Sequence, residues 1–341
     1  MANRKKYPHA DYHGDYLSRR DVIRRMLALG GLGAAGAYLA YAPEDYLGSL
    51  RDHSGLRGMP VELPFRLPDF RVEPVNPSIQ VGIGRGGDTR TMLLKALDAI
   101  GGLTHFIQPG DVVLVKPNVA FDRSPNLGAT THPAIIDTLV RLLLVDARAA
   151  EVRVTDNPIE SPADCFAKSG IGAAAEQAGG RVYLPDPNAF ELLYTPGAKL
   201  IEQWAFLKRP FKNVDKVIGI APAKDHNLCH ASLGIKNWYG LLGGRRNQFH
   251  QDIHEIVSDL SIMIRPTLTI VDGTRVLMEN GPTGGDPSNV RDGNAILAGV
   301  DPVAMDAWAF EHLLQRPGRL PDYLYICLLY TSDAADDLQP V

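Results

Sequence analysis

The sequence predicts an α/β fold, with a mostly parallel sheet covered by helices on both faces in a three-layer, doubly wound arrangement. From residue 79 onward, short runs rich in β-branched residues alternate with segments of helical apolar spacing. That alternation is typical of parallel sheets buried between helices. The composition agrees, because the 341 residues are 45% hydrophobic and 22% charged, as in globular proteins with a sizeable core.

The first part of the predicted domain contains two strands and their helices. The glycine-rich residues 82–90 lack the order of a phosphate-binding loop and are interpreted as a strand end and a turn. Residues 111–118, DVVLVKPN, form a β-branched run that ends at a proline, which predicts a buried strand. Residues 131–147 have helical spacing, and 150–158 form the second strand. A helix is expected over 161–170, which opens with Ser-Pro and closes with Gly.

The second part continues the alternation. By the same patterns, strands are expected over 180–186, 214–224, 266–273 and 294–302. Helices are expected over 250–265 and 303–314. The single domain therefore spans 79–326, preceded by a Pro-rich linker or extended segment over 44–78, where prolines disfavour both helix and interior strand.

Polar residues cluster where the predicted strands end. In an open α/β sheet, ligands bind beyond the carboxyl ends of the strands, so parallel strands would bring these residues to one edge. Each Asp or Asn, taken singly, is also a common turn former or helix cap. The residues at these strand ends are Lys116, Asn118, Asp156, Asn157, Lys224, His226, Asp272 and Asp301.

The segment 224–240, KDHNLCHASLGIKNWYG, carries the densest group of reactive side chains. Lys224 and His226 follow a strand, and Lys236-Asn237 lie among glycines that permit close approach of the backbone. Lysines beside such a backbone favour an anion. Lys236 would also be a nucleophile if burial lowered its pKa. The alternative of a solvated lysine in a surface loop is disfavoured by the apolar residues around it.

The histidines and cysteines are the residues that bear on metal and cluster binding. His250 and His254 are four residues apart at the start of a predicted helix, a spacing that suits a metal ion, although HQDIHE is not the HExxH of zinc proteases. The chain has three cysteines and no CxxC pair, so a cysteine-ligated iron–sulfur cluster is not expected. The cofactor remains unknown, with a metal ion left open. A net charge of −4 gives no indication of nucleic-acid binding.

Residues 1–43 resemble a twin-arginine export signal or an N-terminal anchor. Arg19-Arg20 precede a Gly/Ala-rich apolar run that ends near Ala42. The pattern predicts recognition by the twin-arginine translocase. The protein would then lie in the periplasm or be anchored to the outer face of the cytoplasmic membrane.

The C-terminal residues have a sequence that is unusual for a protein. Residues 327–337, CLLYTSDAADD, resemble translated adapter DNA from transposon-based sequencing libraries. We therefore expect residues 327–341 to be a non-native tail and the domain before it to be truncated near Ile326.

Seven motifs resemble, in order and spacing, the domain-of-unknown-function family 362 over residues 79–315. They are VLVKPNV (113–119), TTHPAIIDTLVRLL (130–143), VTDNP (154–158), the segment 224–240, HQDIHE, TIVDG (269–273) and ILAGVDPVAMDAWA (296–309). The resemblance implies a set of positions of interest that brings in Thr131, Pro133 and Asp306. The full set is Lys116, Asn118, Thr131, Pro133, Asp156, Lys224, His226, Lys236, Asn237, Asp272, Asp301 and Asp306. Many members of that family carry a cysteine-rich ferredoxin-type module, which this chain does not have. The resemblance to members with such a module suggests a redox role and a redox partner protein, by analogy alone.

These features predict an exported enzyme or enzyme-like protein, of no assigned reaction, that binds an anionic small molecule at the strand carboxyl ends. Lys116, Lys224 and Lys236 would hold the anion, with Lys236 also a candidate catalytic residue. Asn118 and Asn237 would orient it, and Asp156 or His226 would move protons. Two alternatives stay open. One is a metal-dependent hydrolase or isomerase that uses the histidines with Asp272 or Asp301, and the other is a non-catalytic periplasmic ligand-binding or cofactor-assembly factor.

Overall fold

The computed structural model describes residues 64–336, with side chains described up to residue 329. The predicted export signal and the first part of the Pro-rich segment lie outside the described residues. The rest of that segment contains no helix, and its one sheet contact is a bridge from Phe65 to Leu193. None of the helices between residues 64 and 336 combines the length and apolar character that crossing a membrane requires.

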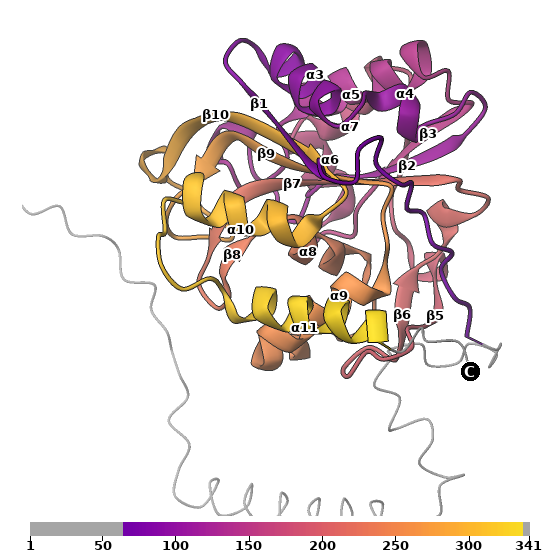
Figure 1. Ribbon diagram of the computed structural model, residues 1–341, viewed down its shortest axis with the longest axis vertical. Coiled ribbons are helices and arrows are strands. Elements are labelled where there is room, and N and C mark those ends of the chain that lie inside the picture. Colours follow the sequence, from indigo (N-terminus) through magenta and orange to yellow (C-terminus); the bar gives the residue numbers. More distant parts are fainter. Residues whose placement is uncertain (1–63, 337–341) are drawn as a thin grey trace, which may run out of the picture. The chain divides into compact units, whose positions relative to one another are not determined.

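One mixed sheet forms the centre of the fold (Figure 1). Neighbours pair in parallel from β9 through β7 and β2 to β3 and β4, whereas β10 pairs antiparallel with both β1 and β9. A short strand, β8 (His230–Ser232), pairs with the end of β7. Across the sheet the order is β1 (Val81–Arg85), β10 (Val290–Gly299), β9 (Leu268–Leu277), β7 (Lys216–His226), β2 (Val112–Lys116), β3 (Glu151–Thr155) and β4 (Arg181–Tyr183).

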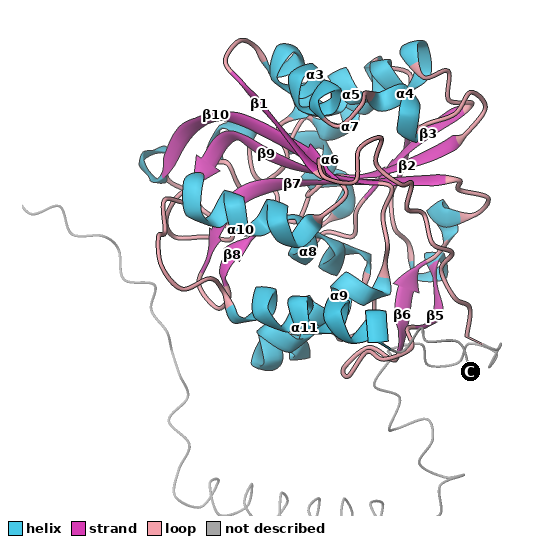
Figure 2. Cartoon of the chain, in the orientation of Figure 1, coloured by secondary structure: helices cyan, strands magenta, loops and turns pink. Residues whose placement is uncertain are grey.

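Helices cover both faces of the sheet, which confirms the predicted fold class (Figures 1 and 2). One layer contains α3 (Thr89–Ala99), α4 (Leu103–Phe106), α5 (Pro133–Arg141), α6 (Pro162–Lys168) and α7 (Ile171–Gln177). The other contains α8 (Gly234–Asn237), α9 (Ile253–Met263), α10 (Pro302–His312) and α11 (Asp322–Asp336). Strand β2 joins the two cores, because successive side chains point to opposite faces: Val113 and Val115 pack into one core and Leu114 into the other.

Several expected elements differ in detail from the structure. The helix expected from residue 250 begins at Ile253, and a 3₁₀ segment, η6 (Arg246–Asp252), precedes it. The helix expected to 147 ends at Arg141 and continues as a π-helical turn. A separate hairpin of β5 (Phe190–Tyr194) and β6 (Gln203–Leu207) was not expected. Helix α11 includes part of the tail that we expect to be non-native, and no site residue described below lies after Ile326.

Candidate functional site

A small buried pocket lies where three parallel strands end. Strands β2, β3 and β7 are neighbours, so the polar residues that follow them meet at one edge of the sheet. Helix α8 and the 3₁₀ turn after it, η5 (Trp238–Leu241), close the opposite side. We call this cavity of about 60 Å³ the inner pocket. Of the residues predicted from the sequence, those that line it are Lys116, Asn118, Asp156, Asn157, Lys224, His226, Lys236, Asn237 and His250.

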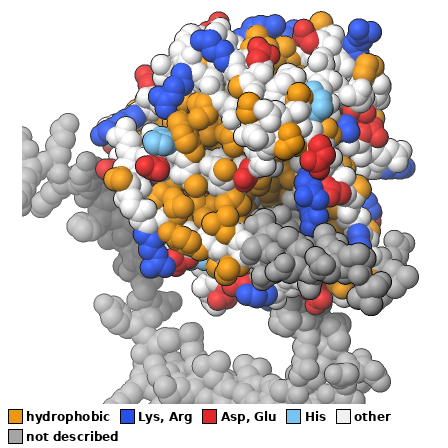
Figure 3. Space-filling model, viewed as in Figure 1, with side chains coloured by type: hydrophobic (Ala, Val, Ile, Leu, Met, Phe, Trp, Pro, Cys, Tyr) orange, Lys and Arg blue, Asp and Glu red, His pale blue; other side chains and the backbone are white. Residues whose placement is uncertain are grey.

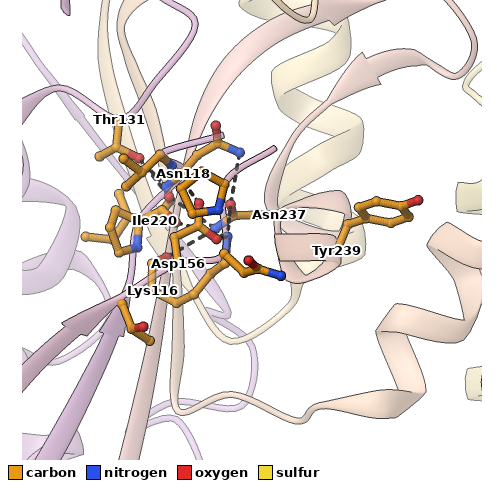
Figure 4. A network of polar contacts seen from close by, with 12 residues as sticks. Lys116, Asn118, Thr131, Asp156, Ile220, Asn237 and Tyr239 are labelled. Carbon is orange, nitrogen blue, oxygen red and sulfur yellow. Dashed lines mark hydrogen bonds and ion pairs between the residues drawn. The ribbon is translucent and has the colours of Figure 1, made fainter. Parts of the chain in front are cut away.

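A buried ion pair between Lys116 and Asp156 forms the floor of the site. Lys116 Nζ lies 2.7 Å from Asp156 Oδ1, and their side chains are 0% and 1% exposed. Nζ also donates to Asn237 Oδ1 at 2.8 Å, and Asp156 Oδ2 accepts from the Val119 amide at 2.7 Å (Figure 4). Burial lowers the pKa of Lys116, and the Asp156 charge opposes that effect. The ion pair therefore keeps Lys116 positioned as a cation inside the protein.

Two asparagines connect the strand ends to α8. The Asn237 amide nitrogen donates to the carbonyls of Lys116 and Ile220, both at 3.2 Å, and its oxygen accepts from Asn118 Nδ2 at 3.2 Å. Thr131 lies behind this network rather than on the pocket wall. Its hydroxyl accepts from the backbone amide of Asn118 and donates to the Ile220 carbonyl, both at 2.9 Å (Figure 4). The amides and Thr131 thus hold the pocket in shape.

Lys224 and Lys236 have no carboxylate partner among the described residues. Lys224 Nζ donates to Asn118 Oδ1 at 3.0 Å and to the Ala129 carbonyl at 2.6 Å. Lys236 Nζ lies 5.2 Å from the centre of the Tyr239 ring. Burial lowers the pKa of both lysines, and the Lys236 charge helps to bring the pKa of Lys224 well below its usual value. Both side chains therefore respond strongly to any negative charge placed in the pocket.

Arg246 is a pocket residue that sequence reasoning missed. It is buried, and its guanidinium donates to four carbonyl oxygens, those of Tyr239, Leu242, Asn157 and Pro158, at 2.7–3.2 Å. All four acceptors are neutral, and no carboxylate among the described residues pairs with Arg246. The neighbouring Arg245 is exposed, and nothing in the local sequence distinguishes these two arginines. Tyr239, another missed residue, also lines the pocket.

His226 presents a neutral imidazole to the pocket. Its Nδ1 accepts from the backbone amides of Leu228 and Cys229, at 3.2 and 3.4 Å. Burial lowers the pKa of His226 to about 2, with further contributions from the Lys236 and Lys224 charges. With Nδ1 an acceptor, the proton of the neutral ring is on Nε2. His226 is therefore a hydrogen-bond donor through Nε2.

The structure separates the two histidines proposed as metal ligands. His250 lies in η6, with its ring 6.4 Å from that of His226, whereas His254 lies in α9, 6.4 Å from the rings of His230 and Tyr323. The expectation that the two side chains share one helical face is wrong, because the 3₁₀ segment interrupts the predicted helix. Across residues 64–336, no three His, Cys, Asp or Glu side chains gather in a way that would hold a metal ion.

Three predicted aspartates lie outside the inner pocket. Asp272 accepts from the His132 amide at 2.8 Å and from Thr274. Asp301 caps α10 at the end of the sheet where the parallel strands begin. The expectation that it joins the other strand ends is therefore wrong, because β10 runs antiparallel to β9. Asp306 accepts from the Gly234 and Ile235 amides at 2.7 and 3.1 Å, and so positions the start of α8. Burial raises the pKa of Asp306 to about 7.

Comparisons with known proteins agree with the motif pattern. The family described as "Domain of unknown function (DUF362)" matches residues 113–311. The chain is 25% identical over 250 residues to the thylakoid-associated protein sll1697 of Synechocystis sp., covering 69% of this chain and 73% of that one.

Two solved structures resemble the chain at low similarity, both with 15% sequence identity. They are the lactate racemase apoprotein from Thermoanaerobacterium thermosaccharolyticum (TM-score 0.39) and a protein from Thermotoga maritima (TM-score 0.32). These matches cover 72% and 66% of this chain, and it spans 58% and 55% of theirs.

Proposed function

This chain belongs to the DUF362 family, and we propose that it binds an anionic small molecule in the inner pocket. The observation that carries the proposal is a surplus of buried cationic side chains. Lys116, Lys224, Lys236 and Arg246 line the pocket together with Asp156, the one carboxylate among its described lining residues. Placing charges away from water is costly unless opposite charges accompany them. A bound anion would supply the missing counter-charge.

The size of the pocket restricts which part of a ligand enters it. A volume of about 60 Å³ holds a compact group, since one water molecule occupies about 30 Å³ of the liquid. A carboxylate or phosphate head group fits this description. Lys236 is the best placed to contact it, because Lys116 already pairs with Asp156 and Arg246 already donates to carbonyls.

The same groups support proton transfer on the bound anion. We assign the proton-handling role to His226, whose neutral ring donates through Nε2, and to the amine of Lys224. The Lys116 cation would stabilise negative charge that develops nearby. Asp156 serves as the counter-ion of Lys116, since its two oxygens contact Nζ and the Val119 amide. Export by the twin-arginine route and a redox partner remain proposals that rest on the sequence.

We expect Lys236→Met to weaken the binding of inorganic phosphate about 30-fold or more, because removing one charge from a buried ionic contact costs about 2 kcal/mol or more. Isothermal calorimetry on the purified full chain measures the affinity. The unfolding temperature should fall little, since the substitution breaks no ion pair within the described residues. Lys212→Met, at an exposed position, is the matched control and should bind as the wild type does. Equal affinities of Lys236→Met and the wild type would refute the proposed site.

Binding of the anion should also be accompanied by proton uptake. Burial lowers the pKa values of Lys116, Lys224 and Lys236, and a negative charge beside them raises these values again. In the alkaline range below the usual lysine pKa near 10.4, the complex therefore holds more protons than the free protein.

Calorimetry of phosphate binding in buffers of different ionisation enthalpy measures this uptake. The Lys224→Met variant should take up fewer protons than the wild type, while Lys212→Met should be unchanged. Proton release on binding, or no exchange at all, would contradict the assignment.

A further inference from the structure

A second and larger cavity adjoins the inner pocket. Its volume is about 630 Å³, within the range of about 300–1,000 Å³ found for small-molecule sites. We call it the outer cavity. Its wall includes Asp225, Asn227, His230, Phe310, Arg316 and Leu320. Among the described residues, His226 alone lines both the outer cavity and the inner pocket.

The charges of the outer cavity are balanced, in contrast to those of the inner pocket. Asp225 Oδ1 lies 2.6 Å from Arg316 Nη2, and Asp322 Oδ1 lies 2.6 Å from Arg319 Nη2. Each arginine on this wall therefore has a carboxylate of its own. A cavity with paired charges offers no net attraction to a further charge, so it suits an uncharged group.

The wall between the two cavities is firmly built. Arg316 also donates to the carbonyls of His230 and Met278, and Asp225 Oδ2 accepts from the Gly281 amide at 2.9 Å. These bonds fix the end of β7, where His226 is the last residue, and the start of β8. The pair Asp225–Arg316 thus holds the rim of the outer cavity and leaves its polar groups satisfied.

Apolar side chains complete the outer cavity. Phe310 comes from α10, and Leu320 and Pro321 come from the segment that leads to α11. Figure 3 shows hydrophobic side chains gathered over α10 and toward α11, with charged side chains around them. An organic group placed here would bury apolar surface, which favours binding by about 25 cal/mol for each Å².

We propose that the outer cavity holds the uncharged, partly apolar body of a ligand whose anionic head lies in the inner pocket. The ligand class is an organic oxyanion, with one phosphate or carboxylate head and a neutral body. The inference rests on the proposed function, because it takes the inner pocket as the site of the head. The bond that joins head and body passes beside the imidazole of His226, the group to which we assign proton transfer.

A series of probes with one head and growing bodies tests the proposal: inorganic phosphate, methyl phosphate, phenyl phosphate and 1-naphthyl phosphate, with 1-naphthoate to compare the head groups. We expect the wild-type affinity to rise along the series, by tenfold or more from inorganic to naphthyl phosphate, about 1.4 kcal/mol. Leu320→Trp fills the outer cavity and should remove this rise while leaving inorganic phosphate binding unchanged.

Asn227→Trp, on an exposed turn, provides a second filling variant in case the first folds poorly. Leu184→Trp, an exposed leucine away from both cavities, is the matched control and should retain the rise. A flat wild-type series would overturn the inference, as would an equal loss of inorganic and naphthyl phosphate binding in both filling variants. Naphthyl phosphate binding that is unaffected by Lys236→Met would overturn the proposed anion site itself, which keeps the two failures distinct.

Discussion

Lys116→Met should lower the free energy of unfolding by about 3–5 kcal/mol, because it removes one partner of a fully buried ion pair. The Asp156 carboxylate, 1% exposed and 2.7 Å from Lys116 Nζ, would be left without its counter-ion. The Asn237 oxygen would also lose a donor at 2.8 Å. Urea denaturation, followed by circular dichroism, measures the change. Methionine has nearly the shape of the lysine stem, so the loss of charge is the principal difference.

The double variant Lys116→Met/Asp156→Asn is the control for this interpretation. Removing both charges leaves neither one buried alone, so the double variant should be more stable than the sum of the two single effects predicts. Strictly additive single effects would show that the pair does not interact. Both single variants should also lose phosphate binding, because Asn237 and α8 are positioned through Lys116.

Gly240→Ala is expected to cost about 3 kcal/mol, at the upper end of the range for overpacking, and to abolish phosphate binding. A Cβ atom at Gly240 would lie 2.1 Å from Asp156 Oδ1 and 2.7 Å from Lys116 Nζ. No side chain beyond hydrogen fits there without moving the buried ion pair. Equilibrium denaturation and phosphate calorimetry, applied to the same sample, report the two effects.

Gly172→Ala provides the matched comparison. It lies in α7, and its Cβ would meet its nearest neighbours at ordinary contact distances from 3.4 Å. Alanine in a helix is favoured over glycine by up to about 1 kcal/mol, so this variant should be as stable as the wild type or slightly more stable. If Gly240→Ala matched it in stability and in binding, the close packing of the pocket against the ion pair would be disproved.

The two cavities differ in their charge, and this difference indicates where each end of a ligand would bind. On the inner side, Lys224, Lys236 and Arg246 contribute charge and have no carboxylate partner in the part of the chain that the structure describes. On the outer side, Asp225 and Arg316 neutralise one another. Natural proteins often retain such costly buried charges where function needs them. The inner pocket is accordingly the place where a phosphate should raise the stability of the protein most.

The sequence by itself determined the elements and most of the pocket. β-branched runs that end in polar residues predicted β2, β3 and β7, and with them Lys116, Asp156 and Lys224. These predictions succeeded because buried parallel strands have continuous apolar runs in the sequence, and the polar residues that follow them lie at the carboxyl ends of the strands. The glycine-flanked Lys236-Asn237 was found in the same way, since its apolar neighbours indicated burial.

Only the tertiary structure decided which strand ends meet and which charged side chains turn inward. Asp301 follows a strand as clearly as Asp156 does, yet β10 runs antiparallel and places Asp301 at the other edge of the sheet. Arg246 is buried and Arg245 beside it is exposed. The direction of β10 and the burial of Arg246 depend on contacts between residues far apart in the chain, and in these two cases the local sequence gives no signal.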